Sequence, residues 1–139
     1  MLAGIALLLA MAGMLTTATP AQAAPAQIQA VPCSAVAYTP YLSGGRVYFY
    51  GAVYCDVYAQ RIEITVVRVK NGYAVGSETF GCGIAYSGHS DYWCEGTTSQ
   101  PDQGGNQEWC TYNQSWVWTV DGRSGAVTSD KSCEPWGSP

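Results

Sequence analysis

Six cysteines constrain the fold of this chain more than any other feature. They are Cys33, Cys55, Cys82, Cys94, Cys110 and Cys133. An even number of cysteines behind an export signal is typical of a disulfide-braced extracellular domain, so we expect three disulfides. Zinc is the alternative, but a zinc site would need C-x-x-C pairs or additional histidine ligands. The closest two cysteines are Cys82 and Cys94, and His89 is the single histidine, so we expect disulfides and no metal site.

The N-terminal segment predicts export from the cell. Leu2 to Leu15 is an uncharged, mostly apolar run, and an A-x-A motif follows at Ala21-Gln22-Ala23. This pattern is typical of a cleaved signal peptide, so we expect residues 1–23 to be removed and the protein to be secreted. The run is shorter than the roughly 20 residues that span a membrane, and no longer apolar run follows, so we expect no membrane anchor.

The mature chain is expected to consist of a leader, one domain and a tail. Residues 24–32 are rich in Ala, Pro and Gln, which predicts a flexible leader. The cysteines enclose a domain over 33–133, and we expect residues 134–139 to form a loose tail. The formal net charge is −4, with six Lys and Arg residues scattered among ten Asp and Glu residues. Because there is no basic patch, nucleic acid is not an expected partner.

Short alternating segments predict an antiparallel all-β domain. Polar and apolar residues alternate over stretches that are separated by Gly, Asn, Asp and Ser. The expected strands are 34–41, 46–58, 61–70, 73–82, 91–98, 107–120 and 124–132. Asn71-Gly72 is the strongest turn signal, because a two-residue type I′ turn needs positive φ at both positions. Seven strands in a domain of this length favour a two-sheet sandwich of immunoglobulin-like size.

The positions of the cysteines relative to the turns predict how they pair. In an antiparallel hairpin, paired residues are equidistant from the turn, and the midpoint of each successive cysteine pair falls at a glycine-bearing turn. The midpoints are Gly44, Gly88 and Asp121-Gly122. Opposite residues in antiparallel strands lie about 4.5–5.5 Å apart at Cα, within reach of a disulfide. We therefore expect the pairs 33–55, 82–94 and 110–133. The main alternative is a bridge from Cys55 to Cys110 between two sheets, as in immunoglobulin domains.

A row of tyrosines alternates with apolar residues over 46–58. The row consists of Tyr48, Tyr50, Tyr54 and Tyr58. A hairpin centred on Gly44 would add Tyr38, opposite Tyr50. The odd positions are more apolar, so we expect them to face the core and the tyrosines to face outward. Cross-strand aromatic pairs stabilise a sheet by about 0.2–1 kcal/mol each, which explains the row without a ligand. A large exposed aromatic patch would instead indicate a binding surface.

Two tryptophans alternate in the segment "WVWTV" at 116–120. A hairpin centred on Asp121-Gly122 would place Trp116 opposite Val127 and Trp118 opposite Gly125. Tryptophan over a strand glycine is a known packing arrangement, so we expect the pair to pack in the core or on a sheet face. Exposed rings would instead resemble a platform on which sugars stack.

The remaining polar residues form no recognisable catalytic or cofactor-binding pattern. His89 has Ser87, Ser90 and Asp91 beside it, but nucleophile–base sites assemble from distant segments, so we interpret His89 as an exposed turn residue. The ten carboxylates could supply a glycosidase pair, but their spacing selects no two of them. The segment 102–108 faintly resembles a calcium loop and lacks its ligand spacing. We therefore expect a protein that is not an enzyme and that holds no cofactor.

The Ala-rich leader, the hairpin in "IEITVVRVKNGYAVG" and the six-cysteine framework resemble small secreted β-sandwich proteins of actinobacteria. The resemblance spans most of the mature chain and implies a fold and an extracellular location, but no catalytic residues. We expect foremost an interaction module that binds an extracellular glycan or protein. The candidate binding residues are Tyr38, Tyr48, Tyr50, Tyr54, Tyr58, Trp116 and Trp118. The alternatives are a secreted inhibitor or toxin-like effector, acting through a disulfide-braced loop such as 83–93 or 99–107, and a small hydrolase that uses carboxylates.

Overall fold

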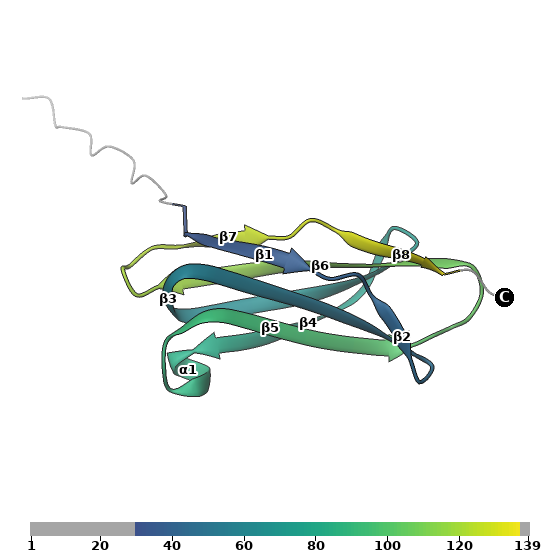
Figure 1. Cartoon of the computed structure of the whole chain (residues 1–139), viewed down its shortest axis with the longest axis horizontal. Helices are drawn as coiled ribbons and strands as arrows, with labels where there is room; N and C mark the ends of the chain where they lie inside the picture. The colour runs from purple at the N-terminus through teal and green to yellow at the C-terminus, as the bar shows by residue number, and fades with distance from the viewer. Residues whose placement is uncertain (1–29, 137–139) are drawn as a thin grey trace, which may run out of the picture.

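The computed structural model describes residues 30–136, which form eight β-strands and one short helix (Figure 1). The elements are β1 (Cys33–Ala37), β2 (Tyr41–Ser43), β3 (Arg46–Lys70), β4 (Tyr73–Gly83), α1 (Ile84–Ser87), β5 (Asp91–Pro101), β6 (Gln107–Thr119), β7 (Ser124–Thr128) and β8 (Ser132–Trp136). The expected all-β class is confirmed. No helix in this part of the chain is long and apolar enough to cross a membrane. The predicted signal peptide and its cleavage site lie outside the described residues, as does most of the leader.

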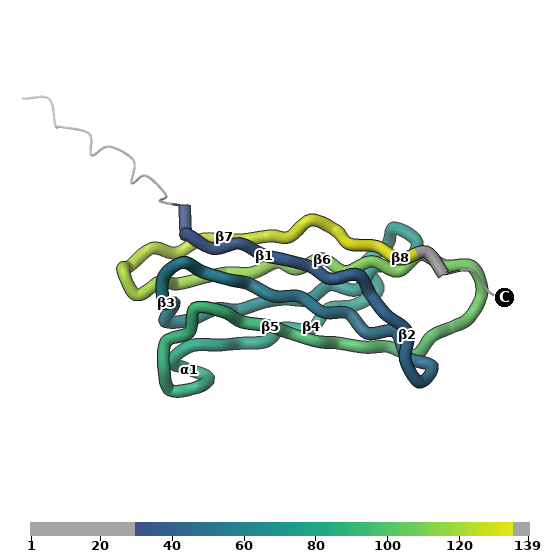
Figure 2. The backbone as a smooth tube through the Cα atoms, in the orientation of Figure 1, coloured from purple at the N-terminus to yellow at the C-terminus, as the bar shows by residue number. Residues whose placement is uncertain are grey.

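One long strand, β3, forms the spine of the fold. Its N-terminal half pairs with β1 and β2 on one edge and with β5 on the other. Its C-terminal half pairs with β4 on one edge and with β6 on the other. β6 also pairs with β7 and β8, so all eight strands belong to one antiparallel sheet. The unbroken path of β3 through both halves of the sheet can be followed in Figure 2.

The core-facing positions of β3 shift from odd to even numbers at an irregularity near Ala59, where β3 has one more residue than its partner β6. Odd-numbered residues such as Phe49 and Val53 face the core in its first half, whereas the even-numbered Ile62 and Ile64 do so in its second half. The pairing with β5 and with β6 is irregular around Ala59, where this change occurs. Both halves of β3 therefore enclose one core, and the sheet has the shape of a half-barrel (Figure 1).

The expected division into seven strands and two sheets is not seen. The expected strands 46–58 and 61–70 are the two halves of β3, because Ala59-Gln60 contains no turn-forming residue and Ala59 is itself paired. The expected strand 124–132 is divided into β7 and β8. β8 continues to Trp136, so the first residues of the expected loose tail pair with β6.

The core combines apolar packing with one buried amide. Phe49 and Trp109 are completely buried and pack edge to face, with ring centroids 5.6 Å apart. Burying an apolar side chain of this kind contributes about 1.5–3 kcal/mol. Asn113 is also buried, and its amide donates hydrogen bonds to the main-chain carbonyls of Val36 (2.7 Å) and Ala52 (3.2 Å). These bonds connect β6 to β1 and β3 across the core.

The three expected disulfides are confirmed: Cys33–Cys55, Cys82–Cys94 and Cys110–Cys133. The first and third join directly opposite residues of paired strands, with Cα atoms 4.0 Å apart. The second was expected to cross a hairpin, and this is wrong, because β4 and β5 each pair with β3 and α1 replaces the expected turn. This bridge therefore connects two strands that pair with different halves of β3.

Two glycine turns hold the hairpins of β3. Asn71 and Gly72 have φ of 48° and 84°, which confirms the expected two-residue turn between β3 and β4. Gly44 and Gly45 both have positive φ, 57° and 72°, and form the turn between β2 and β3. The expected register is confirmed over β1, whose Cys33 lies opposite Cys55.

The hairpin of β6 and β7 lies one residue out of the expected register. Trp116 is opposite Ala126 and Trp118 is opposite Ser124, instead of Val127 and Gly125. The turn contains three residues and is closed by a hydrogen bond from the Thr119 amide to the Arg123 carbonyl. A three-residue hairpin loop of this kind adds a bulge, which shifts the pairing by one position.

Candidate functional site on the outer faces of the sheet

The tyrosine row lies on the outer face of the first half of β3. The odd-numbered residues 47–55 are buried as expected, and the even-numbered tyrosines point to the other side. Antiparallel partners share a face, so side chains from neighbouring strands join the row. We call the resulting surface the tyrosine face, and it comprises Tyr38, Tyr41, Tyr48, Tyr50, Tyr54 and Trp93.

The rings of the tyrosine face contact one another in pairs from neighbouring strands. The pairs are Tyr38–Tyr50, Tyr41–Tyr48 and Tyr54–Trp93, with ring centroids 4.7, 5.2 and 6.5 Å apart. The planes of the last two pairs are inclined by only 11° and 14°. Because the three pairs follow one another along β3, they form a continuous aromatic surface. Tyr41 is 53% exposed, and the other rings are exposed or half-buried.

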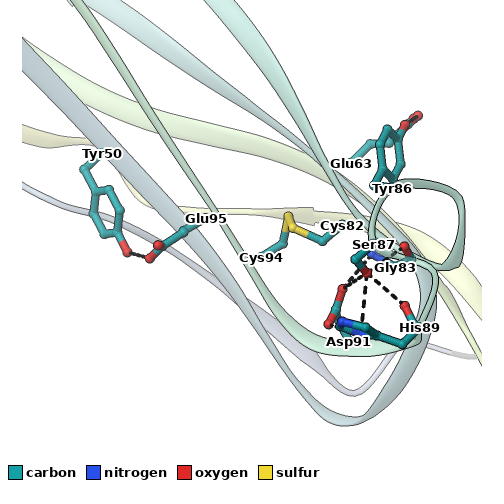
Figure 3. The surroundings of a disulfide bond; sticks show 10 residues. All are labelled: Tyr50, Glu63, Cys82, Gly83, Tyr86, Ser87, His89, Asp91, Cys94 and Glu95. Carbon is teal, nitrogen blue, oxygen red and sulfur yellow. Dashed lines mark hydrogen bonds and ion pairs between the residues drawn. A yellow bond between two sulfur atoms is a disulfide. The ribbon is translucent and has the colours of Figure 1, made fainter.

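Ala52 lies at the centre of the tyrosine face and is completely buried. The Tyr50 hydroxyl donates a hydrogen bond to the carboxylate of Glu95, the residue opposite Ala52 on β5 (Figure 3). The hydroxyls of Tyr38 and Tyr54 lie 3.4 Å apart. These hydroxyl contacts connect the side chains around Ala52, and part of each ring remains accessible to solvent.

Two charged side chains, Glu95 and Arg46, form hydrogen bonds beside the rings of the tyrosine face. Burial, and then the neighbouring Glu95 carboxylate, raise the pKa of Tyr50 above its ordinary value. Tyr50 is therefore protonated at neutral pH and donates, while the Glu95 carboxylate accepts. At the other end of the face, Arg46 Nε donates to Ser99 Oγ at 3.1 Å. The surface thus combines exposed aromatic rings with hydroxyl, carboxylate and guanidinium groups in fixed positions.

Tyr58 lies at the end of the row, beside the bend of β3. Its ring makes an edge contact with Tyr92, with centroids 5.7 Å apart, and both rings are more than half exposed. The five tyrosines that were expected to form one surface are therefore divided between two places. Four belong to the tyrosine face, and Tyr58 pairs with the start of β5.

The two tryptophans lie on a different surface, the outer face of the second half of the sheet. Trp116 is 44% exposed, Trp118 is half-buried, and their ring centroids are 6.1 Å apart. The Arg61 guanidinium lies over the Trp118 ring, with Cζ 4.8 Å from the centroid, in a cation–π contact. The pair therefore packs on the sheet face and not in the core.

His89 belongs to a hydrogen-bonded cluster beside the Cys82–Cys94 bridge (Figure 3). Its Nδ1 lies 3.0 Å from Asp91 Oδ1 and 3.5 Å from Ser87 Oγ. Asp91 Oδ2 also accepts hydrogen bonds from Ser87 Oγ (3.1 Å) and from the Gly83 amide (2.7 Å). A nucleophile–base relay places the serine and the carboxylate on different ring nitrogens. Here both contact the same nitrogen, so the cluster is suited to bracing the loop around α1.

Other polar clusters in the described part of the chain also have structural partners. Within residues 30–136, the one group with the side chains of a metal site is Glu108, Cys110 and Cys133. The two cysteines form a disulfide and offer no thiolate to an ion. In the segment considered for calcium, the Asp102 carboxylate accepts hydrogen bonds from the Gly104 amide and the Gln107 side chain. These groups stabilise the loop and the strand pair that contain them.

Comparisons of the chain with protein-family models, curated proteins and solved structures found no match. The resemblance to small secreted proteins of actinobacteria therefore stays a prediction. The function has to be inferred from the chemistry of the surfaces themselves.

Sequence reasoning missed two residues of the tyrosine face, Tyr41 and Trp93, and the neighbouring Glu95, which accepts the Tyr50 hydrogen bond. A turn centred between Gly44 and Gly45, and not on Gly44 alone, would have placed Tyr41 opposite Tyr48. No local signal could have found Trp93 and Glu95. They join the face because β5 pairs with a segment of β3 that is distant in the sequence.

Proposed function

We propose that this protein is an extracellular binding module, without catalytic activity, that holds a glycan chain on the tyrosine face. The observation that carries this proposal is the row of exposed and half-buried rings, paired across neighbouring strands, from Tyr41 to Trp93. Large exposed aromatic surfaces are uncommon in monomeric proteins and mark interaction sites. Three disulfides fit an extracellular protein, where glycans are abundant.

The chemistry of the face suits a sugar ring. A pyranose presents C–H groups on its flat sides and hydroxyls at its rim. The exposed surfaces of the rings can pack on those C–H groups and remove apolar surface from water. The hydroxyls of Tyr38 and Tyr54, the Glu95 carboxylate and the Arg46 guanidinium can hydrogen-bond to the sugar hydroxyls at the rim.

The shape of the face favours an extended chain of equatorially substituted sugars. Sugars of this kind, such as β-1,4-linked glucose or N-acetylglucosamine, have two flat apolar sides and form straight ribbons. Tyr41, Tyr50 and Trp93 come from three different strands, so the row of rings crosses the sheet as well as following β3. A ribbon-like glycan can cover several rings in succession.

Retention of the protein on insoluble cellulose and chitin tests this proposal. The double variant Tyr50→Ala/Tyr54→Ala should be retained clearly less than the wild type, because it lacks the central rings. Tyr73→Ala is the matched control, since Tyr73 is 78% exposed and lies at the β3–β4 turn, outside the tyrosine face. The control should be retained like the wild type. Equal retention of all three proteins, or no retention of the wild type, would contradict the proposal.

The loop around α1 supports a second candidate function, inhibition of another protein. α1 contains no buried residue, and Ile84, Tyr86 and Tyr92 are each more than half exposed. The Cys82–Cys94 bridge and the Asp91–Gly83 hydrogen bond fix the shape of this loop. A preorganised loop loses little entropy on binding. Inhibition of a panel of secreted proteases that Ile84→Ser abolishes would favour this function over glycan binding.

A further inference from the structure

A second aromatic groove lies on the outer face of the other half of the sheet. It has a volume of about 490 Å³ and is bordered by residues of β3, β4, β6 and β7. We call it the tryptophan groove, after Trp116. Its other principal residues are Glu63, Thr65, Thr79, Gln114, Ala126 and Thr128. None of these residues belongs to the tyrosine face.

The strand register leaves the Trp116 ring accessible from one side. Its partner on β7 is Ala126, whose small side chain does not cover the ring. Its partner on β3 is Glu63, and the next residue across is Gly81 of β4. Tyr86 occupies the space above Gly81, since a Cβ there would lie 2.2 Å from its ring. The groove is therefore closed at the Tyr86 end and open beside Trp116.

Uncharged hydrogen-bonding groups form the neighbouring row of the groove. Thr79, Thr65, Gln114 and Thr128 follow one another across four adjacent strands. The Thr65 and Thr79 hydroxyls lie 2.8 Å apart and bond to each other. The exposed Gln114 amide offers both a donor and an acceptor. A stacking ring beside a row of hydroxyl and amide groups complements both the C–H faces and the hydroxyls of a sugar.

The charge of the tryptophan groove is already neutralised from within the protein. Of the residues that border it, Glu63 alone is charged. Its carboxylate forms an ion pair with Arg61 and accepts a hydrogen bond from the Tyr86 hydroxyl at 2.9 Å. These two partners hold the pKa of Glu63 below its ordinary value, so the pair stays ionised at neutral pH. A charged ligand would find no free counter-charge here, and an uncharged one meets no repulsion.

We propose that the tryptophan groove is a second, independent binding site for an uncharged β-1,4-linked glycan. The two aromatic surfaces lie on the outer sides of the two halves of β3, with the core between them. One glycan chain on each surface would make this single domain a bridge between two chains. The bridging rests on the proposed function of the tyrosine face, whereas the site in the groove does not.

Calorimetric titration with cellohexaose and with hexa-N-acetylchitohexaose tests the site. We expect two hexasaccharides per wild-type domain for at least one of these probes. Trp116→Ala should bind one, Tyr50→Ala/Tyr54→Ala should bind one, and Tyr73→Ala should still bind two. Ala126→Gln is a second test variant, because it fills the groove from an exposed position and leaves Trp116 in place. It should also bind one hexasaccharide, and the thermal unfolding of each variant checks that it is folded.

The number of hexasaccharides that each variant binds distinguishes the site in the tryptophan groove from the proposed function of the tyrosine face. If the tyrosine face does not bind glycan, the wild type binds one hexasaccharide, and Trp116→Ala and Ala126→Gln abolish this binding. If Trp116→Ala and Ala126→Gln bind as many hexasaccharides as the wild type, the groove is not a site and the inference is wrong. Absence of binding of both probes to the wild type would overturn both proposals.

The bridging of two glycan chains by one domain can be measured separately, as turbidity. If both sites bind, the wild type should raise the turbidity of a soluble, high-molecular-weight β-1,4-glucan derivative such as hydroxyethyl cellulose. Either single-surface variant should bind this polymer without raising its turbidity. Turbidity that survives in Trp116→Ala would contradict the role of the groove as the second site.

Discussion

Asn113 occupies the space that a side chain on residue 51 would need. A Cβ on Gly51 would lie 2.9 Å from Asn113 Nδ2 and 3.2 Å from Asn113 Cβ. Because glycine leaves this space free, the Asn113 amide reaches the carbonyls of Val36 and Ala52. The contact holds β1 and the first half of β3, which support the tyrosine face, against β6 on the other side of the core.

Gly51→Ala should therefore lower the free energy of unfolding by about 1–3 kcal/mol, the usual cost of overpacking a core. Val66 Cγ2 would also lie 3.3 Å from the added methyl group, so the methyl group is crowded by two neighbours. Urea unfolding followed by tryptophan fluorescence measures the change. Gly125→Ala is the matched control, since the nearest atoms there are 3.8 Å away, and its effect should stay within about 0.5 kcal/mol. Equal effects of the two substitutions on the free energy of unfolding would show that Asn113 does not exclude a methyl group at position 51.

Removing the Cys82–Cys94 bridge should loosen the loop around α1 as well as lower stability. A disulfide stabilises by about 2–4 kcal/mol, and this one joins strands that have no backbone pairing with each other. The double variant Cys82→Ala/Cys94→Ala should show faster amide hydrogen exchange over residues 84–92. In Cys33→Ala/Cys55→Ala the strands remain paired, so exchange over 84–92 should not change beyond the global loss of stability. Unchanged exchange in the first variant would contradict the bracing role.

The turn between β6 and β7 should lose stability in acid. The Asp121 carboxylate accepts hydrogen bonds from Arg123 Nε (3.0 Å) and from Thr119 Oγ1, and these partners hold the pKa of Asp121 well below its ordinary value. A lowered folded-state pKa stabilises above the unfolded value of about 3.9, and the contribution is lost as the pH falls through the folded-state pKa. The stability difference between the wild type and Asp121→Asn should therefore shrink when the pH is lowered from 7 to 3.

Urea unfolding at both pH values checks this dependence. Asp130→Asn makes the same charge change at an exposed position outside the turn and is the control. If the two variants showed the same pH dependence relative to the wild type, the Asp121 turn would not be its source.

Local patterns predicted most of the strand segments and the pairs Cys33–Cys55 and Cys110–Cys133, because alternation and glycine turns act over short distances. Cys82–Cys94 was predicted correctly from a hairpin that the structure does not contain. Gly44 and Asn71-Gly72 placed two hairpins, and the pairing of Cys33 with Cys55 followed from the first. The continuity of β3 through Ala59 could not be predicted, because a strand can bend without any turn residue. The pairing of β5 with the first half of β3 has no local signal in the sequence either. The positions of Trp93 and Glu95 beside the tyrosines therefore could not be predicted.

Within the tyrosine face, stacking should matter more than the hydroxyl of Tyr50. Tyr50→Phe keeps the ring and removes the hydrogen bond to Glu95, so its affinity for cellohexaose should fall by less than about threefold. Tyr50→Ala removes the stacking surface, and its affinity for the tyrosine face should fall by about tenfold or more, which corresponds to about 1.4 kcal/mol. Calorimetry on the Trp116→Ala background isolates this face. An equal loss in the two variants would indicate that the hydrogen bond, and not stacking, holds the ligand.

The most direct test of the account is the response of individual aromatic rings to a glycan. In a carbon–proton NMR spectrum of the aromatic side chains, titration with cellohexaose or with hexa-N-acetylchitohexaose should shift the ring signals of Tyr41, Tyr50, Tyr54 and Trp93 in a saturable way. The exposed Tyr73 ring should stay unchanged. If neither hexasaccharide moves the tyrosine-face signals, or if saturable shifts occur only in Tyr86 and Tyr92 beside α1, then the tyrosine face is not a glycan-binding surface.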